Sequence, residues 1–430
     1  MMKKIVFILV IWTITGLSAH AQLLRGIGNM VKNKAVEKAT GEAEKRIGKI
    51  LNGKKERQPG PESEPPVQNG QVSAQAQTTS YSKYDFVQGE NVIYFDDFSQ
   101  SAIGELPIGW NASGKGEVVK VDGEDGKWLR LFPGSSYLSG NSKPFGENYT
   151  IEFDVLMNGT PPSGTRFLPN FILGMISTGK QQTTHNSFLK SSTVINNKLE
   201  VLIKPNVDKI STVAMESSGP NKLNTFSTGV INMPDFNETL GRTVHYAIQV
   251  QKQRFRMWID GKKIFDTPRA INISPALNQF MFKPAEYWMY NENNYGLYLS
   301  NFRVATGNPN VGTKLSLSES FSTSGIRFQT GSSEILPESY GILREIGQAL
   351  SDNGDLRFRV TGHTDNLGDQ KINLKLSEKR AEAVVAYLVN NFKTNIKHLE
   401  IKGKGSMVPL ADNNSQEGRA QNRRVEFTKL

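Results

Sequence analysis

An acidic and a basic side chain lie on either side of a turn-rich segment near the carboxyl end of the chain. Asp365 follows a short run of alternating apolar and charged residues, and Arg380 lies in the amphipathic stretch that comes next. A carboxylate accepts hydrogen bonds from an ammonium group, and a planar guanidinium binds a carboxylate through two parallel bonds. If both side chains face one pocket, they can hold a zwitterion such as the α-carbon end of an amino acid.

Two elements must position these side chains. Residues 356–361 alternate as a half-buried strand does, and residues 372–391 carry apolar side chains at helical spacing, namely Leu376, Ala381, Val384, Val385 and Leu388. Taken alone, Asp365 is also typical of a turn or a helix cap, and Arg380 of a solvated helix face. Both interpretations stay open from these residues alone.

The wider pattern is more specific. It consists of Gly362-His363-Thr364-Asp365, Asn373, Leu376-Ser377, Arg380-Ala381, Val384, Leu388, Gly418-Arg419-Ala420 and Asn422-Arg423-Arg424-Val425. This pattern, over residues 321–430, resembles the OmpA-like peptidoglycan-binding domain. The resemblance implies a βαβαβ-type α/β domain that grips the diaminopimelate of the peptidoglycan stem peptide. It also implies roles for the side chains: Asp365 binds the ammonium, Arg380 binds the carboxylate, and Thr364, Asn373 and Arg423 support them.

The sequence departs from that family in one loop. Some members have Asp or Asn after the first strand of the domain, where this chain has Phe328-Gln329-Thr330-Gly331-Ser332, so a ligand contact from this loop is in doubt. His363 could suggest a metal or catalytic site, but no second histidine is near it in sequence. We expect a structural hydrogen bond there, with no metal and no cofactor.

The amino terminus has the features of a secretory signal. Lys3 and Lys4 form a basic start, residues 5–14 an apolar core, and Ala19-His20-Ala21 a small-residue cleavage site, which predicts a signal peptide over residues 1–21. No other apolar run approaches the roughly 18 residues of a membrane-spanning helix. The sequence has no cysteine, which excludes disulfides, thiolate metal sites and a lipid-modified N-terminal cysteine.

The next two segments differ in composition. Residues 22–57 are basic and carry apolar residues at three- and four-residue steps, which predicts an amphipathic helix weakened by the glycines at 26, 28, 41 and 48. This helix would lie on a membrane surface or pair with a partner helix, and a marginal helix that only precedes a linker is an equal alternative. Residues 58–88 are rich in Pro, Gln, Ser and Gly, which predicts a flexible linker. The formal net charge is +10, but an exported protein seldom meets nucleic acid. We expect acidic envelope polymers or anionic lipid head groups instead.

Residues 89–305 contain many short alternating segments separated by turns, which predicts an antiparallel β-sandwich. Asp260-Gly261 is typical of a tight hairpin turn, and Thr150, Glu152 and Asp154 are expected on a wet strand face. The pattern of Phe95-Asp96-Asp97-Phe98, the hairpin 258–262 and the closing run 297–304 resembles the concanavalin-A-like jelly roll of lectins and glucanases.

That resemblance makes a carbohydrate-active enzyme the rival hypothesis. The glucanases of this class present Glu-x-Asp-x-x-Glu, with two glutamates about 5 Å apart across the scissile bond. Here the series starts with Glu152 and Asp154 but ends in Met157, so we expect no catalytic residues and no hydrolysis. Several aromatic residues could stack on sugars, although aromatic residues in strands are more often core: Trp110, Tyr287, Trp288, Tyr290 and Tyr295.

The rest of the chain completes the prediction. Residues 306–320 are expected to be a linker, 325–329 a strand, Pro337 the start of a helix, and 398–402 and 424–428 the last strands. The sequence thus predicts a multidomain envelope protein in the periplasm or at the outer membrane of a Gram-negative cell. Its C-terminal domain binds peptidoglycan and its sandwich binds a glycan or an envelope protein. A motor-stator-like protein is disfavoured because it would retain a transmembrane helix.

Overall fold

The computed structural model describes residues 84–141, 143–163, 165–179, 187–190, 197–220, 225–290, 294–307 and 310–430. The chain divides into two compact units. The first is Ser82–Pro309 with Ala411–Gln421, and the second contains Asn310–Leu410 and Asn422–Leu430. The predicted signal peptide, the basic segment and most of the predicted linker 58–88 lie outside the described residues. Among the described residues, no helix has the length and apolar composition needed to cross a membrane.

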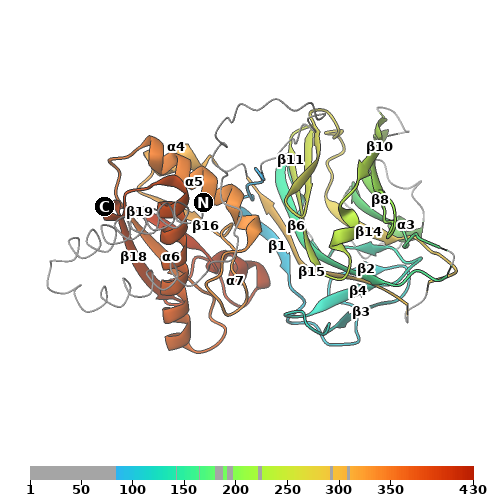
Figure 1. Ribbon diagram of the computed structural model, residues 1–430, viewed down its shortest axis with the longest axis horizontal. Helices are drawn as coiled ribbons and strands as arrows, with labels where there is room; N and C mark the ends of the chain where they lie inside the picture. Colours follow the sequence, from blue (N-terminus) through green and yellow to red (C-terminus); the bar gives the residue numbers. More distant parts are fainter. Residues whose placement is uncertain are drawn as a thin grey trace, which may run out of the picture. The chain divides into compact units, whose positions relative to one another are not determined.

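The first unit contains two antiparallel sheets that face each other (Figure 1). The strands of one sheet, in hydrogen-bonded order, are β13 (Lys262–Thr267), β12 (Arg254–Ile259), β11 (Thr243–Gln251), β6 (Asn148–Gly159), β15 (Tyr295–Thr306), β4 (Trp128–Leu131) and β3 (Gly116–Val119), and β1 (Asn91–Asp96) pairs with β15. Those of the other are β10 (Phe226–Met233), β9 (Ser211–Ser218), β8 (Lys198–Lys204), β7 (Phe171–Ile176), β14 (Gln279–Pro284), β5 (Tyr137–Leu138) and β2 (Asn111–Ala112). Two short helices, α3 (Ser187–Lys190) and η3 (Phe236–Thr239), lie in the connections.

Apolar side chains from both sheets form the core of this unit. Phe153 on β6 stacks on Tyr246 of β11, with 5.3 Å between ring centroids, and meets Phe282 on the opposite sheet edge-on at 5.1 Å. The hairpin between β12 and β13 turns at Asp260-Gly261, both with positive φ, as its sequence predicts. The prediction of a mostly antiparallel β-sandwich is confirmed at this level.

The predicted wet face of β6 is wrong. Thr150, Glu152 and Asp154 are all buried, because β6 lies between β11 and β15 in the sheet and other groups cover its outer face. The hydroxyl of Thr150, for example, accepts a hydrogen bond from the backbone N–H of Gly89 at 2.9 Å. Alternation alone cannot distinguish a solvated face from one that is covered by another segment.

The end of the predicted linker 58–88 is also ordered on this sheet. Phe86 is fully buried and packs edge-on against Trp258 with 5.3 Å between ring centroids. Asp85 accepts a hydrogen bond from the indole nitrogen of Trp258 at 3.1 Å. The sandwich therefore begins before residue 89, because Tyr84 and Phe86 follow the polar stretch and pack in a small apolar cluster with Trp258.

The second unit has a four-stranded sheet in the order β16 (Ser320–Thr323), β19 (Val425–Lys429), β17 (Phe358–His363) and β18 (Leu399–Gly405). Only β17 and β18 are parallel. The helical segments are α4 (Val311–Leu317), η4 (Pro337–Ser339), α5 (Tyr340–Asp352), α6 (Gln370–Phe392) and η5 (Ile396–His398). The last helix, α7 (Gln416–Asn422), belongs to the first unit except for Asn422. Helix α6 packs along β17 and β18 (Figure 1), and its helical prediction over 372–391 is confirmed.

Two predictions for this unit are wrong in detail. The expected linker 306–320 contains α4, which starts where the side chain of Asn310 accepts a hydrogen bond from the N–H of Thr313. The expected strand 325–329 is absent from the described sheet, whose edge is β16 instead. Residues 325–336 fold back on themselves, so that Phe328 forms only an isolated bridge with Ile335.

Candidate ligand-binding site

Asp365 lies in the loop that follows β17. It is 8% exposed. Its Oδ1 accepts a hydrogen bond from the N–H of Leu367 at 3.2 Å, and its Oδ2 lies 2.7 Å from Nη1 of Arg423. The carboxylate is thus a turn residue and a charged group of a site at the same time, and the two interpretations left open by the sequence do not exclude each other.

Arg380 extends from α6 to the loop 328–332. Its Nε donates a hydrogen bond to the carbonyl oxygen of Ser332 at 2.9 Å, and its guanidinium carbon lies 4.9 Å from the centroid of the Phe328 ring. The alternative of a solvated helix face is therefore wrong. Among the described residues, no partner is found for Nη1 and Nη2 of Arg380. The guanidinium of Arg380 is therefore held through its Nε and through the face that lies on Phe328, and the N–H groups of Nη1 and Nη2 remain available to a ligand.

Three charged groups influence one another here. Burial, followed by the positive charge of Arg423, lowers the pKa of Arg380 to about 10, and the negative charge of Asp365 opposes the shift. One carboxylate beside two guanidinium groups leaves an excess of positive charge. A ligand that brings a carboxylate to Arg380 relieves this excess, while its ammonium group can bind the carboxylate of Asp365.

Thr364 and Asn373 brace the loop that carries Asp365. The N–H of Thr364 donates to the carbonyl of Gly405 at 3.0 Å, and its hydroxyl donates to the carbonyl of Asp365 at 2.8 Å. The side-chain amide of Asn373 donates to the carbonyl of Leu367 at 2.8 Å. The structure therefore brings all five predicted site residues to one end of β17, with Thr364 and Asn373 holding the backbone.

Glycines allow α6 to lie very close to the sheet. A Cβ on Gly362 of β17 would lie 2.0 Å from the carbonyl oxygen of Ser377, and one on Gly403 of β18 would lie 2.8 Å from its hydroxyl. These glycines are register partners on neighbouring strands. The contact fixes the height of the α6 turn that carries Arg380 relative to the strand end that carries Asp365.

Two residues of the site were missed from the sequence. The loop 328–332 contains neither Asp nor Asn, but it contributes the ring of Phe328 and the carbonyl of Ser332 to Arg380. A backbone carbonyl has no sequence signature. The aromatic residue directly before a Gln-Thr-Gly turn is the one signal that could have indicated it.

His363 is the last residue of β17, and its side chain is buried. Its Nε2 lies 3.3 Å from a carboxylate oxygen of Glu426. Burial, and then the positive charge of Arg424, lowers the pKa of His363 to about 4, although Glu426 opposes the shift. Neither ring nitrogen of His363 has a hydrogen-bond partner of good geometry among the described residues, so the expected structural hydrogen bond is not found, and a neutral imidazole lies beside the carboxylate instead.

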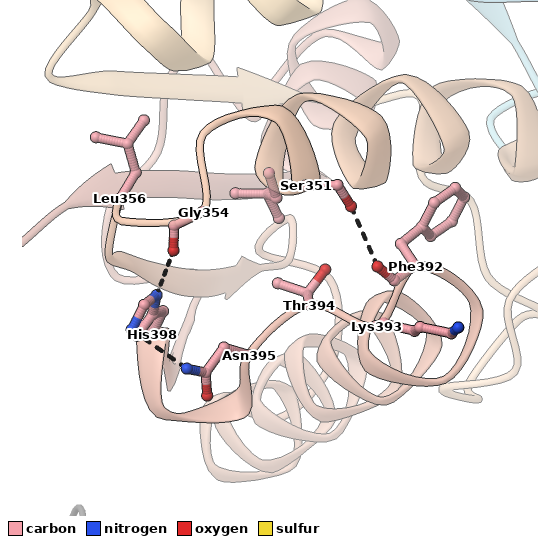
Figure 2. A pocket seen from close by; sticks show the side chains of 9 residues that line it. Ser351, Gly354, Leu356, Phe392, Lys393, Thr394, Asn395 and His398 are labelled. Carbon is pink, nitrogen blue, oxygen red and sulfur yellow. Dashed lines mark hydrogen bonds between the residues drawn. The ribbon is translucent and has the colours of Figure 1, made fainter.

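A separate pocket lies at the opposite end of β17 (Figure 2). It has a volume of about 230 Å³ and includes none of the five predicted residues. Nδ1 of His398 lies 2.8 Å from the carbonyl of Gly354, so this nitrogen carries the hydrogen, since a carbonyl can only accept. The hydroxyl of Thr394 is buried without a hydrogen-bond partner among the described residues.

The carboxylates of the sandwich pair with nearby basic groups. Glu152 lies 2.7 Å from Nη1 of Arg303, and Asp154 lies 2.7 Å from Nδ1 of His245. The sequence did not predict that His245 would meet this strand. Met157 lies in the core between the sheets, on the opposite face of β6 from both carboxylates. Position 157 therefore does not share a face with Glu152, whichever residue occupies it.

Comparison with known proteins identifies the C-terminal part. Residues 327–423 match the OmpA family. Over 102 residues the chain is 40% identical to the peptidoglycan-binding protein ArfA of Mycobacterium tuberculosis, a match that covers 24% of this chain and 31% of that protein. Over 103 residues it is 38% identical to the outer-membrane lipoprotein YfiB of Pseudomonas aeruginosa, covering 24% of this chain and 61% of that one.

The chain thus spans less than two thirds of the length of these relatives. Among solved structures, the peptidoglycan-associated lipoprotein from Burkholderia pseudomallei is 25% identical, and the likeness covers 28% of this chain and 98% of that one with a TM-score of 0.24. The family match contains all five predicted site residues. Residues 327–423 are an OmpA family domain.

Proposed function

We propose that the OmpA family domain binds peptidoglycan non-covalently by gripping the diaminopimelate of the stem peptide. The observation that carries the proposal is the pair of Nη donors on Arg380, which are held beside the carboxylate of Asp365. A relative that is 40% identical over 102 residues is named a peptidoglycan-binding protein. Diaminopimelate has a second amino-acid centre, with one carboxylate and one ammonium, and this centre matches the two charges of the site.

We also propose a cellular location for the protein. The predicted signal peptide and the outer-membrane relative support an exported envelope protein that meets the wall in the periplasm or at the outer membrane. A peripheral membrane contact through residues 23–57 stays a prediction, because those residues lie outside the described part.

The test is co-sedimentation of the full chain with purified sacculi. Arg380→Ala should clearly lower the fraction of the chain in the pellet, since losing one partner of a desolvated charge pair costs about 2–5 kcal/mol. Arg380→Lys should rescue poorly because an ammonium has no planar fork. Asp365→Asn keeps the shape and removes the charge that an ammonium requires, so it should also weaken binding.

The type of wall serves as the matched control. Sacculi that carry lysine in place of diaminopimelate lack the second zwitterionic centre and should bind the wild type weakly. Equal binding of both walls would overturn the zwitterion mechanism, and wild-type retention of Arg380→Ala would overturn the site. All three variants must keep the thermal unfolding temperature of the wild type for the result to count.

For the sandwich we propose binding without catalysis, to a glycan or an envelope partner, with a concanavalin-A-like jelly roll as its fold. The burial of Glu152 and the core position of Met157 support this over the alternative of a carbohydrate-active enzyme. Release of reducing sugar from wall or storage glycans by the full chain, lost in Glu152→Gln and Asp154→Asn, would favour the enzyme instead.

A further inference from the structure

One tryptophan of the sandwich is presented to solvent. Trp288 is 91% exposed, whereas Trp110, Trp128 and Trp258 are at most 6% exposed. Of the five aromatic residues considered as sugar platforms, Trp110, Tyr290 and Tyr295 are core and Tyr287 is half-buried. Among the described residues no partner is found for the indole N–H of Trp288. Singly exposed apolar side chains are common on protein surfaces, so the exposure of Trp288 matters only together with the way its turn is held.

The segment that carries Trp288 makes hydrogen bonds before and after this residue. Between β14 and β15, the N–H of Ala285 donates to the carbonyl of Asn170 at 2.7 Å, and the side chain of Asn170 bonds the hydroxyl of Tyr287 at 3.2 Å. On the other side the N–H of Tyr290 donates to the carbonyl of Tyr287 at 2.9 Å. Trp288 is therefore displayed from a fixed turn, which lowers the entropy cost of binding.

A second exposed ring is attached to the same turn. The hydroxyl of Tyr290 donates to the carbonyl of Phe167, whose side chain is 54% exposed. Tyr290 also packs edge-on against Tyr287, with 6.4 Å between centroids. One tyrosine thus links the exposed Phe167 to the turn that presents Trp288.

The surroundings favour a sugar over a membrane or a protein. Glu286 and Lys283 near Trp288 are exposed and charged, and Arg166 beside Phe167 forms an exposed ion pair with Asp208 at 3.2 Å. A membrane site needs several apolar residues with basic ones, and a protein hot spot needs a ring of occluding contacts. A pyranose needs one flat ring for its C–H face and a few polar groups for its hydroxyls.

We propose that Trp288, with Phe167 beside its turn, is a platform that binds a polysaccharide by stacking a pyranose ring on the indole. This rests on the proposed binding role of the sandwich and names its ligand class. The indole N–H donates to a sugar hydroxyl, and the polar groups around the turn complete the contact.

The tryptophan itself is the reporter. In a full chain with Trp12→Phe and Arg380→Ala, the emission of Trp288 should be quenched by acrylamide. It should shift to the blue and become protected when an oligosaccharide binds. The probes are glycan strands freed of stem peptides, tetra-N-acetylchitotetraose, maltohexaose and purified lipopolysaccharide polysaccharide, which separate a wall source from other glycans. Because none of them carries diaminopimelate, a failure here does not bear on the site at Arg380.

Variants separate stacking from general apolar contact. In calorimetric titrations, which need no tryptophan reporter, Trp288→Phe should retain most of the affinity, whereas Trp288→Leu and Trp288→Ala should each weaken it by about tenfold or more, since leucine and alanine have no aromatic face. Ile108→Ala, at a site that is 92% exposed in the same unit, is the matched control and should bind as the parent does. Retained binding in Trp288→Leu, no response to any saccharide, or a blue shift only with phosphatidylglycerol vesicles would each overturn the proposal.

Discussion

The five predicted side chains of the site divide into those that can meet a ligand and those that hold them in place. Arg380 and Asp365 offer free donors and a charged acceptor, and Arg423 balances Asp365. The sequence predicted which residues would gather, because an acid in a turn and a base on a helix face follow the pattern of the family. It did not predict Phe328, since the orientation of a guanidinium depends on which ring lies beneath it.

Phe328 orients Arg380 in this view, and Phe328→Leu tests that role. Leucine keeps apolar bulk but has no ring face, and a cation–π contact contributes about 0.5–2 kcal/mol. We expect about threefold to thirtyfold weaker binding to sacculi, with little change in the unfolding temperature. Phe328→Tyr keeps a ring and should restore binding. A leucine variant that sediments as the wild type does would show that the ring does not position Arg380.

His363 predicts a pH dependence of stability. Burial lowers its pKa from 6.5 to about 4 in the folded chain. Between these values the unfolded chain binds more protons than the folded chain, so the free energy of unfolding falls as the pH falls from 6.5 towards 4. In His363→Gln this contribution is absent, and its unfolding temperature should fall less steeply over the same window. Parallel curves for the two proteins, measured by circular dichroism, would contradict the assignment.

At the scale of elements, the spacing of apolar residues along α6 determines which side of the helix packs on β17 and β18. The helical spacing from Leu376 to Leu388 predicted α6 correctly, because an apolar stripe must face the sheet. The strand at 325–329 was wrongly predicted because local alternation could not reveal that Arg327 bonds back to Ser339. In the sandwich, the alternation of apolar and polar residues predicted strand β6, but it did not predict that other groups bury the polar side chains on its outer face. Periodicity identifies an element, whereas its neighbours decide which faces are wet.

Gly362→Ala tests whether the close packing of α6 on β17 positions Arg380. The added methyl would lie 2.0 Å from the carbonyl oxygen of Ser377, so the helix must move away from β17. We expect a loss of about 1–3 kcal/mol of stability from overpacking and weaker sacculus binding, although Gly362 offers no side chain to a ligand.

Gly312→Ala in α4 is the matched control. A Cβ there meets nothing within 4 Å, and alanine is a better helix former than glycine by about 1 kcal/mol. This variant should be as stable as the parent or more so, with unchanged binding. If Gly362→Ala behaved in the same way, close approach of α6 would not set the position of Arg380.

At the scale of the whole molecule, the two proposals together give the chain two chemically different contacts with one polymer. In these proposals the charges of the OmpA family domain bind a stem peptide, and an aromatic ring of the sandwich binds a glycan. Linking two weak sites makes the second contact intramolecular, so a chain remains attached while either site is engaged. This would let modest individual affinities hold an exported protein at the wall.

The double variant Arg380→Ala with Trp288→Ala tests this cooperation on intact sacculi. Each single variant should leave part of the chain in the pellet, because the remaining site still binds, and the double variant should leave almost none. Loss of the ionic contact should make the residual binding of Arg380→Ala insensitive to salt, whereas that of Trp288→Ala should weaken as salt rises, because screening acts on exposed charge pairs. If the double variant sediments as Arg380→Ala alone does, the sandwich contributes nothing to wall attachment, and its glycan must be sought outside the peptidoglycan.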